Sequence, residues 1–179
     1  MPQSASIPLF KRLLGAAFEG LPAPIKRVHD GRAHKVLSGR CHITRGAGVL
    51  VSLLGWAASL PRSGNDLPIQ VSFLCDGARE IWNRDFAGQP MRSTLTERNG
   101  CLEEVFGPAR FRFALRVDDR GIAWTVAGIR VLGLPLPAAW FKAVTARQSV
   151  QAGRYAFDVR AELPWVGLLV HYHGWLEVD

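Results

Sequence analysis

The sequence predicts a mainly β protein, in which an antiparallel meander of about ten strands forms a barrel or a curved half-barrel. Turn signals recur at short intervals from residue 76 to residue 167, among them Asp76-Gly77 and Asn99-Gly100, dipeptides that typically join antiparallel strands. Between the turns, apolar and polar residues alternate, so one face of each strand is apolar. A sheet with that many strands usually curls until its edges approach or meet.

We expect one β domain over residues 1–179, because all-β domains of this length are usually undivided. Residues 1–20 show the apolar spacing of an amphipathic helix, which Gly20 and the following prolines end. The β meander is expected over residues 36–179. An apolar segment near 47–60 has helical length and no strand alternation, so it predicts a helix inserted after the first strand.

The individual strands follow the same alternation. The first strand is expected at about 36–44, with Leu37, Cys41 and Ile43 on its inner face. The later inner faces are predicted to carry Phe111, Phe113, Leu115 and Val117, then Tyr155, Phe157, Val159, Ala161 and Leu163, and finally Leu168, Val170, Tyr172 and Leu176. A short helical piece is expected around Trp140, after the Leu134-Pro135-Leu136-Pro137 break.

Turn geometry also predicts cross-strand partners. A loop at Asp76-Gly77 places Phe73 opposite Glu80 and Val71 opposite Trp82. A loop at Asn99-Gly100 places Leu95 opposite Glu104 and Glu97 opposite Leu102. If Phe86 and Met91 close the hairpin between these two, Glu80 lies opposite Glu97 and Trp82 opposite Leu95.

Polar side chains fall on this inner face among the aromatic ones. One interpretation is a solvated region or an internally satisfied ion network. The other is a polar anchor within an apolar cavity, the usual composition of a small-molecule site. On that interpretation we expect an apolar small-molecule ligand and a binding site formed by Glu80, Trp82, Arg84, Glu97, Glu104, Phe113 and Trp124.

Composition limits the partners and the compartment. The net charge of +7 suits an acidic partner, but the basic residues form no run and no nucleic-acid motif, so we expect no nucleic-acid binding. Three cysteines without a CxxC pair are typical of a reducing compartment, and Lys11 and Arg12 interrupt the apolar stretch where a secretory signal would lie. We therefore expect a soluble cytoplasmic protein.

Metal and cofactor chemistry has little support in the sequence. His171 and His173 project to one side of a strand, and His42 adds a third ligand only if the first and last strands are neighbours. All three fall on the outer face, so surface histidines are the preferred interpretation and no metal is expected. Neither a P-loop nor a dinucleotide fingerprint is present, so no cofactor is expected.

Two further hypotheses concern the helix near 47–60 and the carboxylates. This helix either packs Leu50, Leu53, Trp56 and Leu60 against the barrel or its mouth, or makes a peripheral membrane contact between Arg45 and Arg62. The enzymatic alternative uses Glu80 and Glu97 as a general acid and base, which requires a close pair with one raised pKa. Catalytic residues otherwise remain unassigned.

Several elements together resemble one bacterial family. These are the segment Leu21-Pro22-Ala23-Pro24, the pattern Trp82-x-Arg84-x-Phe86, Phe106-Gly107-Pro108, the element Gly133-Leu134-Pro135-Leu136-Pro137, and Gly174-Trp175-Leu176. They are similar to the family called domain of unknown function 4166, over nearly the whole chain from Leu21 onward. Family members often follow a saccharopine-dehydrogenase-like nucleotide-binding domain. The resemblance therefore implies a bacterial cytoplasmic protein, here in stand-alone form, and as an alternative function an accessory module for a separate NAD(P)-dependent oxidoreductase. A contact surface is then expected around Trp140 and Phe141.

Overall fold

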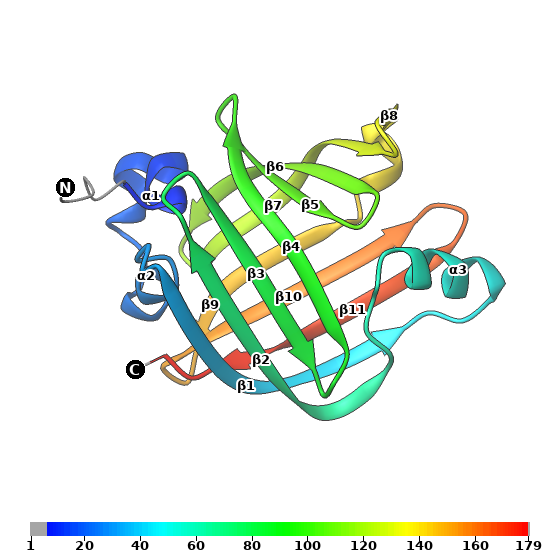
Figure 1. Cartoon of the computed structure of the whole chain (residues 1–179), viewed down its shortest axis with the longest axis horizontal. Coiled ribbons are helices and arrows are strands. Elements are labelled where there is room, and N and C mark those ends of the chain that lie inside the picture. Colours follow the sequence, from blue (N-terminus) through cyan, green and yellow to red (C-terminus); the bar gives the residue numbers. More distant parts are fainter. Residues whose placement is uncertain (1–6, 179) are drawn as a thin grey trace.

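A computed structural model describes residues 7–178, which fold into a closed antiparallel barrel of ten strands with one additional strand (Figure 1). The strands are β1 (His34–Arg45), β2 (Gly64–Cys75), β3 (Arg79–Phe86), β4 (Pro90–Arg98), β5 (Cys101–Phe106), β6 (Ala109–Asp118), β7 (Gly121–Val131), β8 (Leu134–Leu136), β9 (Thr145–Gln151), β10 (Arg154–Leu163) and β11 (Gly167–Leu176). The predicted mainly β meander is confirmed, and the closed barrel is the shape it takes.

Two pairings close the ring. The first strand, β1, pairs with the last, β11, and β6 pairs with β7, while β8 extends the free edge of β7 beyond β9. At the β1–β11 seam, a Cβ on Gly39 would lie 1.8 Å from the carbonyl oxygen of Trp175, and one on Gly174 would lie 2.2 Å from that of Arg40. Glycine at both positions therefore allows the two strands to approach.

The N-terminal segment covers one end of the barrel (Figure 1). It comprises α1 (Leu9–Leu14), a 3-10 helix η1 (Gly15–Phe18) and α2 (Ala23–Val28). The predicted N-terminal helix is present, but it is shorter than 1–20 because Gly15 adopts φ 54° and ends α1, after which the 3-10 helix η1 follows. Residues 1–6 of the predicted range lie outside the described residues. The sequence reasoning missed α2, because Pro22 and Pro24 suggested a connector although proline fits the first turn of a helix.

The two other predicted helices are present. Helix α3 (Val49–Ala57) lies between β1 and β2, and the 3-10 helix η2 (Ala138–Phe141) precedes β9. The predicted packing of α3 is wrong for most of its face. Leu50, Leu53 and Trp56 are 50%, 59% and 78% exposed, whereas Leu60 lies against the barrel core. Among the described residues, no helix is long and apolar enough to cross a membrane.

The predicted cross-strand partners are right for one hairpin and wrong for two. The Asn99-Gly100 hairpin is confirmed, with Leu95 opposite Glu104 and Glu97 opposite Leu102. The first hairpin is wrong by two residues, since Phe73 lies opposite Trp82 and Val71 opposite Arg84. Its loop is Gly77-Ala78, because Gly77 takes the positive φ (80°) and Asp76 pairs with Arg79.

The hairpin between β3 and β4 is also two residues from its predicted register. It closes at Phe86 and Gln89 around Ala87-Gly88, both at positive φ, so Glu80 lies opposite Leu95 and Trp82 opposite Ser93. Each residue still points to its predicted side of the sheet after this shift, because side-chain direction along a strand repeats every two residues. Only Leu168 differs, since an irregularity in the β10–β11 pairing lets Leu169 line the interior instead.

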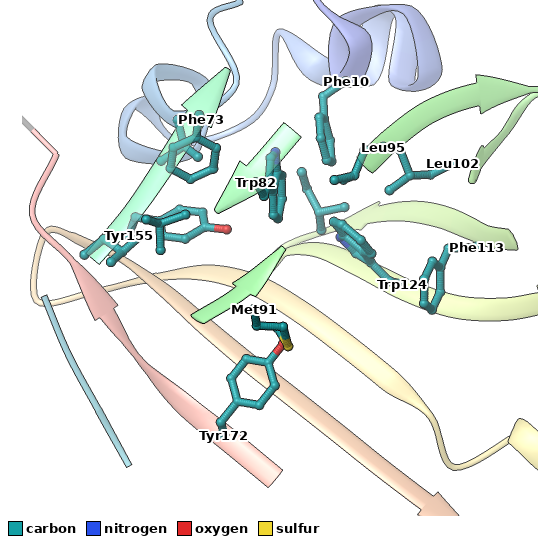
Figure 2. Close-up of a cluster of buried hydrophobic side chains, with 14 of the residues drawn as sticks. Phe10, Phe73, Trp82, Met91, Leu95, Leu102, Phe113, Trp124, Tyr155 and Tyr172 are labelled. Atoms are coloured by element: carbon teal, nitrogen blue, oxygen red, sulfur yellow. The ribbon is translucent and has the colours of Figure 1, made fainter. Parts of the chain in front are cut away.

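The core fills the end of the barrel beneath the N-terminal helices. Phe10 enters from α1 toward Trp82 of β3 and Trp124 of β7, as Figure 2 shows, with ring centroids 6.0 and 5.8 Å from its own. Leu95 and Leu102, from β4 and β5, are fully buried beside them. The aromatic core thus forms the floor of the interior, and the remaining barrel lies beyond it.

Candidate ligand-binding cavity

A cavity of about 480 Å³ occupies the barrel interior and is lined almost entirely by apolar side chains. That volume lies within the range of about 300–1,000 Å³ that is typical of small-molecule sites. Every strand except β1 contributes to the wall or its edge; the lining includes Ile69, Val71, Phe73, Trp82, Met91, Phe111, Phe113, Trp124, Ile129, Tyr155, Phe157, Val159, Ala161, Val170 and Tyr172. The interior is therefore hollow as well as apolar.

The cavity opens at the end opposite the N-terminal helices. Its lining there includes Ala57 of α3, Trp140 of η2 and Trp165 of the β10–β11 turn, and Trp165 is 71% exposed. The rings of Trp140 and Trp165 meet edge to face with centroids 4.8 Å apart. Because the lining residue Trp165 reaches solvent, the mouth lies at this end, where Figure 1 shows α3 far from the N-terminal helices.

A buried ion pair in the cavity wall joins two strands. Arg84 of β3 donates from Nη2 to Oε1 of Glu104 on β5 (3.1 Å) and from Nη1 to Oγ of Ser93 on β4 (2.9 Å). Both charged side chains are about nine-tenths buried. The guanidinium also lies 4.9 Å from the centroid of the Trp82 ring. This arrangement is the internally satisfied ion network of the first interpretation, and its Arg84 and Glu104 line the cavity.

Two tyrosines add hydroxyl groups to the same wall. Tyr155 of β10 and Tyr172 of β11 point their hydroxyls into the interior, Tyr172 toward Met91 (Figure 2). Burial raises the pKa of Tyr172 to about 12 and that of Tyr155 further above its ordinary value of 10, although the nearby Arg84 opposes both shifts. Both hydroxyls stay protonated at neutral pH, and each is able to donate or accept a hydrogen bond.

The floor of the cavity carries a buried polar pair. Nε2 of His29 lies 2.7 Å from Oε1 of Gln148, which lines the cavity, and the His29 ring stacks on Phe10 at 3.6 Å. Burial lowers the pKa of His29 to about 3, so the ring is neutral and donates from Nε2. The indole Nε1 of Trp124, also a lining residue, is buried without a hydrogen-bond partner in the described residues.

The two remaining predicted site residues lie elsewhere. Glu80 is buried but does not line the cavity: its Oε2 accepts from Nε1 of Trp82 (2.9 Å), while Oε1 has no partner among the described residues. Burial raises the pKa of Glu80 to about 7, despite the opposing hydrogen bond from Trp82. Glu97 pairs with Arg12 of α1 (3.1 Å) at the covered end, and its side chain is one-third exposed. The predicted Glu80–Glu97 cross-strand pair does not form.

Comparison with protein families gives one match. The model of the domain of unknown function DUF4166 matches residues 21–176. The chain belongs to the DUF4166 family. No curated protein matches the sequence. The match begins just before α2 and ends at the last residue of β11, so in this DUF4166 protein the family region includes the whole barrel.

The histidines of this DUF4166 protein gather on the outer wall. β1 and β11 are neighbours, with His42 directly opposite His173, and the ring centroids of His42 and His171 lie 5.3 and 5.1 Å from that of His173. His171 also contacts Asp158 at 3.2 Å. Within residues 7–178, no group of histidine, cysteine and carboxylate side chains has the arrangement needed to hold a metal ion.

Sequence reasoning placed Trp82, Arg84, Glu104, Phe113 and Trp124 on the inner wall, and the structure brings all five to the cavity. It did not assign Gln148 or the Tyr155 and Tyr172 hydroxyls to the site, nor Ser93, which holds Arg84 behind the lining. Alternation had already placed the tyrosines inward. No sequence pattern pointed to Gln148, because the alternation did not separate β9 from its neighbours. The hydrogen-bond partner of Gln148, His29, also lies 119 residues away in the chain.

Proposed function

We propose that this DUF4166 barrel binds an apolar small molecule that carries one polar group, without changing it chemically. The observation that carries the proposal is the hollow interior: an apolar cavity of about 480 Å³ that opens at one end. A well-packed protein interior holds few voids larger than a water molecule, so a cavity of this size points to a ligand.

The polar side chains of the cavity wall support one place at which a polar group of the ligand is held. Arg84 and Glu104 neutralise each other, and Arg147, the third charged lining residue, pairs with Asp118, so within residues 7–178 the lining has no uncompensated charge to attract an ion. Beside the first pair, Tyr155 and Tyr172 line the cavity and offer hydroxyls, while the Ser93 hydroxyl accepts from Arg84 behind the lining. A hydroxyl, carbonyl or protonated carboxyl group of the ligand fits such a set, and an apolar chain or ring fits the remaining wall.

The geometry does not favour the enzymatic alternative. General acid–base catalysis by a carboxylate pair requires both groups within reach of one substrate. Glu80 and Glu97 are not opposite each other, and neither lines the cavity. The oxidoreductase partner stays a prediction from the family resemblance; of the surface expected for it, Phe141 is buried and lines the cavity, which leaves Trp140.

A cavity-filling substitution tests the proposal. Ala161 lines the cavity on β10, whereas Ala114 is exposed on the outer face of β6, so Ala161→Phe and Ala114→Phe add the same group to opposite sides of the wall. We expect N-phenyl-1-naphthylamine to bind wild type and Ala114→Phe with saturable fluorescence, and Ala161→Phe about tenfold more weakly or worse. Equal binding by all three proteins contradicts the proposal.

A further inference from the structure

The segments at the mouth of the cavity carry exposed apolar side chains. On α3, Val49, Leu53 and Trp56 are 88%, 59% and 78% exposed, and on the β10–β11 turn Trp165 is 71% exposed. We call this set the apolar rim; its members are Val49, Leu50, Leu53, Trp56, Leu132, Leu134, Trp140 and Trp165. Large apolar side chains exposed together at one end of a folded protein point to a contact site.

The segments that carry the apolar rim also contribute side chains to the cavity lining. Leu54 and Ala57 of α3 line the cavity, while Leu53 and Trp56 face away from it. Likewise, Leu136 at the end of β8 lines the cavity, and Leu134 at the start of the same strand is exposed. Figure 1 shows that α3, β8 and the β10–β11 turn all lie at the end of the barrel opposite the N-terminal helices. Whatever covers the apolar rim therefore also faces the opening of the cavity.

Together, the three segments that carry the apolar rim, 45–63, 127–146 and 163–170, contain basic residues and no aspartate or glutamate. The acidic side chains that flank them, Asp66 and Glu162, are paired with Arg40 and Arg160. Within the three segments, Arg62, Arg130 and Lys142 are exposed. The whole chain carries a net charge of +7. Apolar and aromatic side chains flanked by basic residues are typical of proteins that lie on anionic membranes.

The orientation of α3 is fixed by its connection to the barrel. The Arg45 guanidinium donates to the carbonyl oxygens of Val51 and Ser52, at 3.4 and 3.2 Å, and packs where a Cβ of Gly55 would lie. Val51 and Gly55 are consequently the buried positions of the helix. This contact holds Leu53 and Trp56 outward without a partner in the described part of the chain.

We propose that the apolar rim docks onto an anionic lipid bilayer, and that the barrel exchanges its apolar ligand with that bilayer. The exchange rests on the proposed function. Trp56, Trp140 and Trp165 suit the headgroup region, where indole rings concentrate. Val49, Leu50 and Leu53 suit the acyl boundary beneath it. With the mouth against the bilayer, an apolar ligand passes from lipid to cavity without crossing water, which removes the main barrier to its transfer.

Vesicle co-sedimentation tests this docking. Wild type is mixed with vesicles of phosphatidylcholine alone or with phosphatidylglycerol added, and compared with Leu53→Asp, Trp56→Ser and the matched control Val36→Asp. Val36 is 46% exposed on the outer face of β1, outside the apolar rim. We expect wild type and the control to bind the anionic vesicles, and both rim variants to bind about tenfold more weakly or worse. Melting temperatures verify that each variant folds.

Two outcomes overturn the docking proposal: wild type that binds neither kind of vesicle, or rim variants that bind as well as Val36→Asp. The naphthylamine probe distinguishes this failure from failure of the cavity proposal, because Leu53 and Trp56 do not line the cavity. We expect both rim variants to retain probe binding. We expect Ala161→Phe to show the opposite pattern, with vesicle binding retained and probe binding lost.

Discussion

Arg84 and Glu104 face each other across β4, with 3.1 Å between Nη2 and Oε1, and both side chains are about nine-tenths buried. Arg84 comes from β3 and Glu104 from β5, and Ser93 of the intervening strand accepts a second hydrogen bond from the guanidinium. In this pair both charged side chains line the cavity, whereas Arg147 of the lining pairs with Asp118 outside it. The contribution of this buried pair to the free energy of unfolding can therefore be measured by substituting its two members.

Removing one partner of this pair leaves the other charge buried. We expect Arg84→Met and Glu104→Leu each to lower the free energy of unfolding by about 3–5 kcal/mol. The double variant should recover most of that loss, because a buried ion pair is often replaceable by apolar side chains of similar volume. Urea unfolding of the four proteins measures the coupling. Additive losses in the double variant would show that the two charges act independently.

Glu80 makes stability depend on pH near neutrality. Burial raises its pKa from 4.5 to about 7, so the unfolded chain loses this proton at lower pH than the folded chain. Stability therefore falls as pH rises from about 4.5 through about 7, and stays lower above that range. We expect Glu80→Gln to be more stable than wild type by about 3 kcal/mol above about pH 8 and equal to it near pH 4. A stability difference that does not change with pH contradicts this account.

His29 produces the opposite dependence. Burial lowers its pKa from 6.5 to about 3, so the unfolded chain takes up a proton that the folded chain excludes. Stability is fully present above about pH 6.5 and is lost as pH falls toward about 3. In wild type, Glu80 offsets this loss, so the effect is measured in the Glu80→Gln background. There we expect about 2 kcal/mol to be lost between about pH 6.5 and pH 5.

Substitution His29→Gln in that background should abolish the acid sensitivity, because the glutamine amide can donate to Gln148 without titrating. Chemical unfolding at several pH values provides the comparison. An acid transition that is unchanged by the substitution would assign the sensitivity to another group.

The sequence predicts the inner face of this barrel better than its cross-strand partners, and the reason is geometric. A two-residue slip in a hairpin preserves which side each residue faces, so Trp82 and Arg84 remain inward although Phe73, Val71 and Leu95 change partners. The Asn99-Gly100 loop was predictable because both residues adopt positive φ there (52° and 71°). The Ala87-Gly88 loop was not, because alanine at φ 52° carries no sequence signal.

Whether the inner face encloses a cavity or a packed core was beyond sequence reasoning. The answer depends on how far apart opposite walls stand, for example Phe73 of β2 and Phe113 of β6, which come from distant parts of the chain. The sequence also could not predict that α3 is exposed. An apolar helix is expected to be buried unless its packing geometry on the rest of the protein is known. In this barrel Arg45 and Gly55 determine that geometry.

The account rests on a cavity that holds an apolar molecule, and native mass spectrometry tests this most directly. Wild type, Ala114→Phe and Ala161→Phe are each incubated with a mixture of single-chain fatty alcohols and fatty acids, then transferred to a volatile buffer. We predict one bound molecule per chain for wild type and Ala114→Phe, lost on denaturation, and little or none for Ala161→Phe. Unliganded wild type, or the same adducts on all three proteins, would contradict the account.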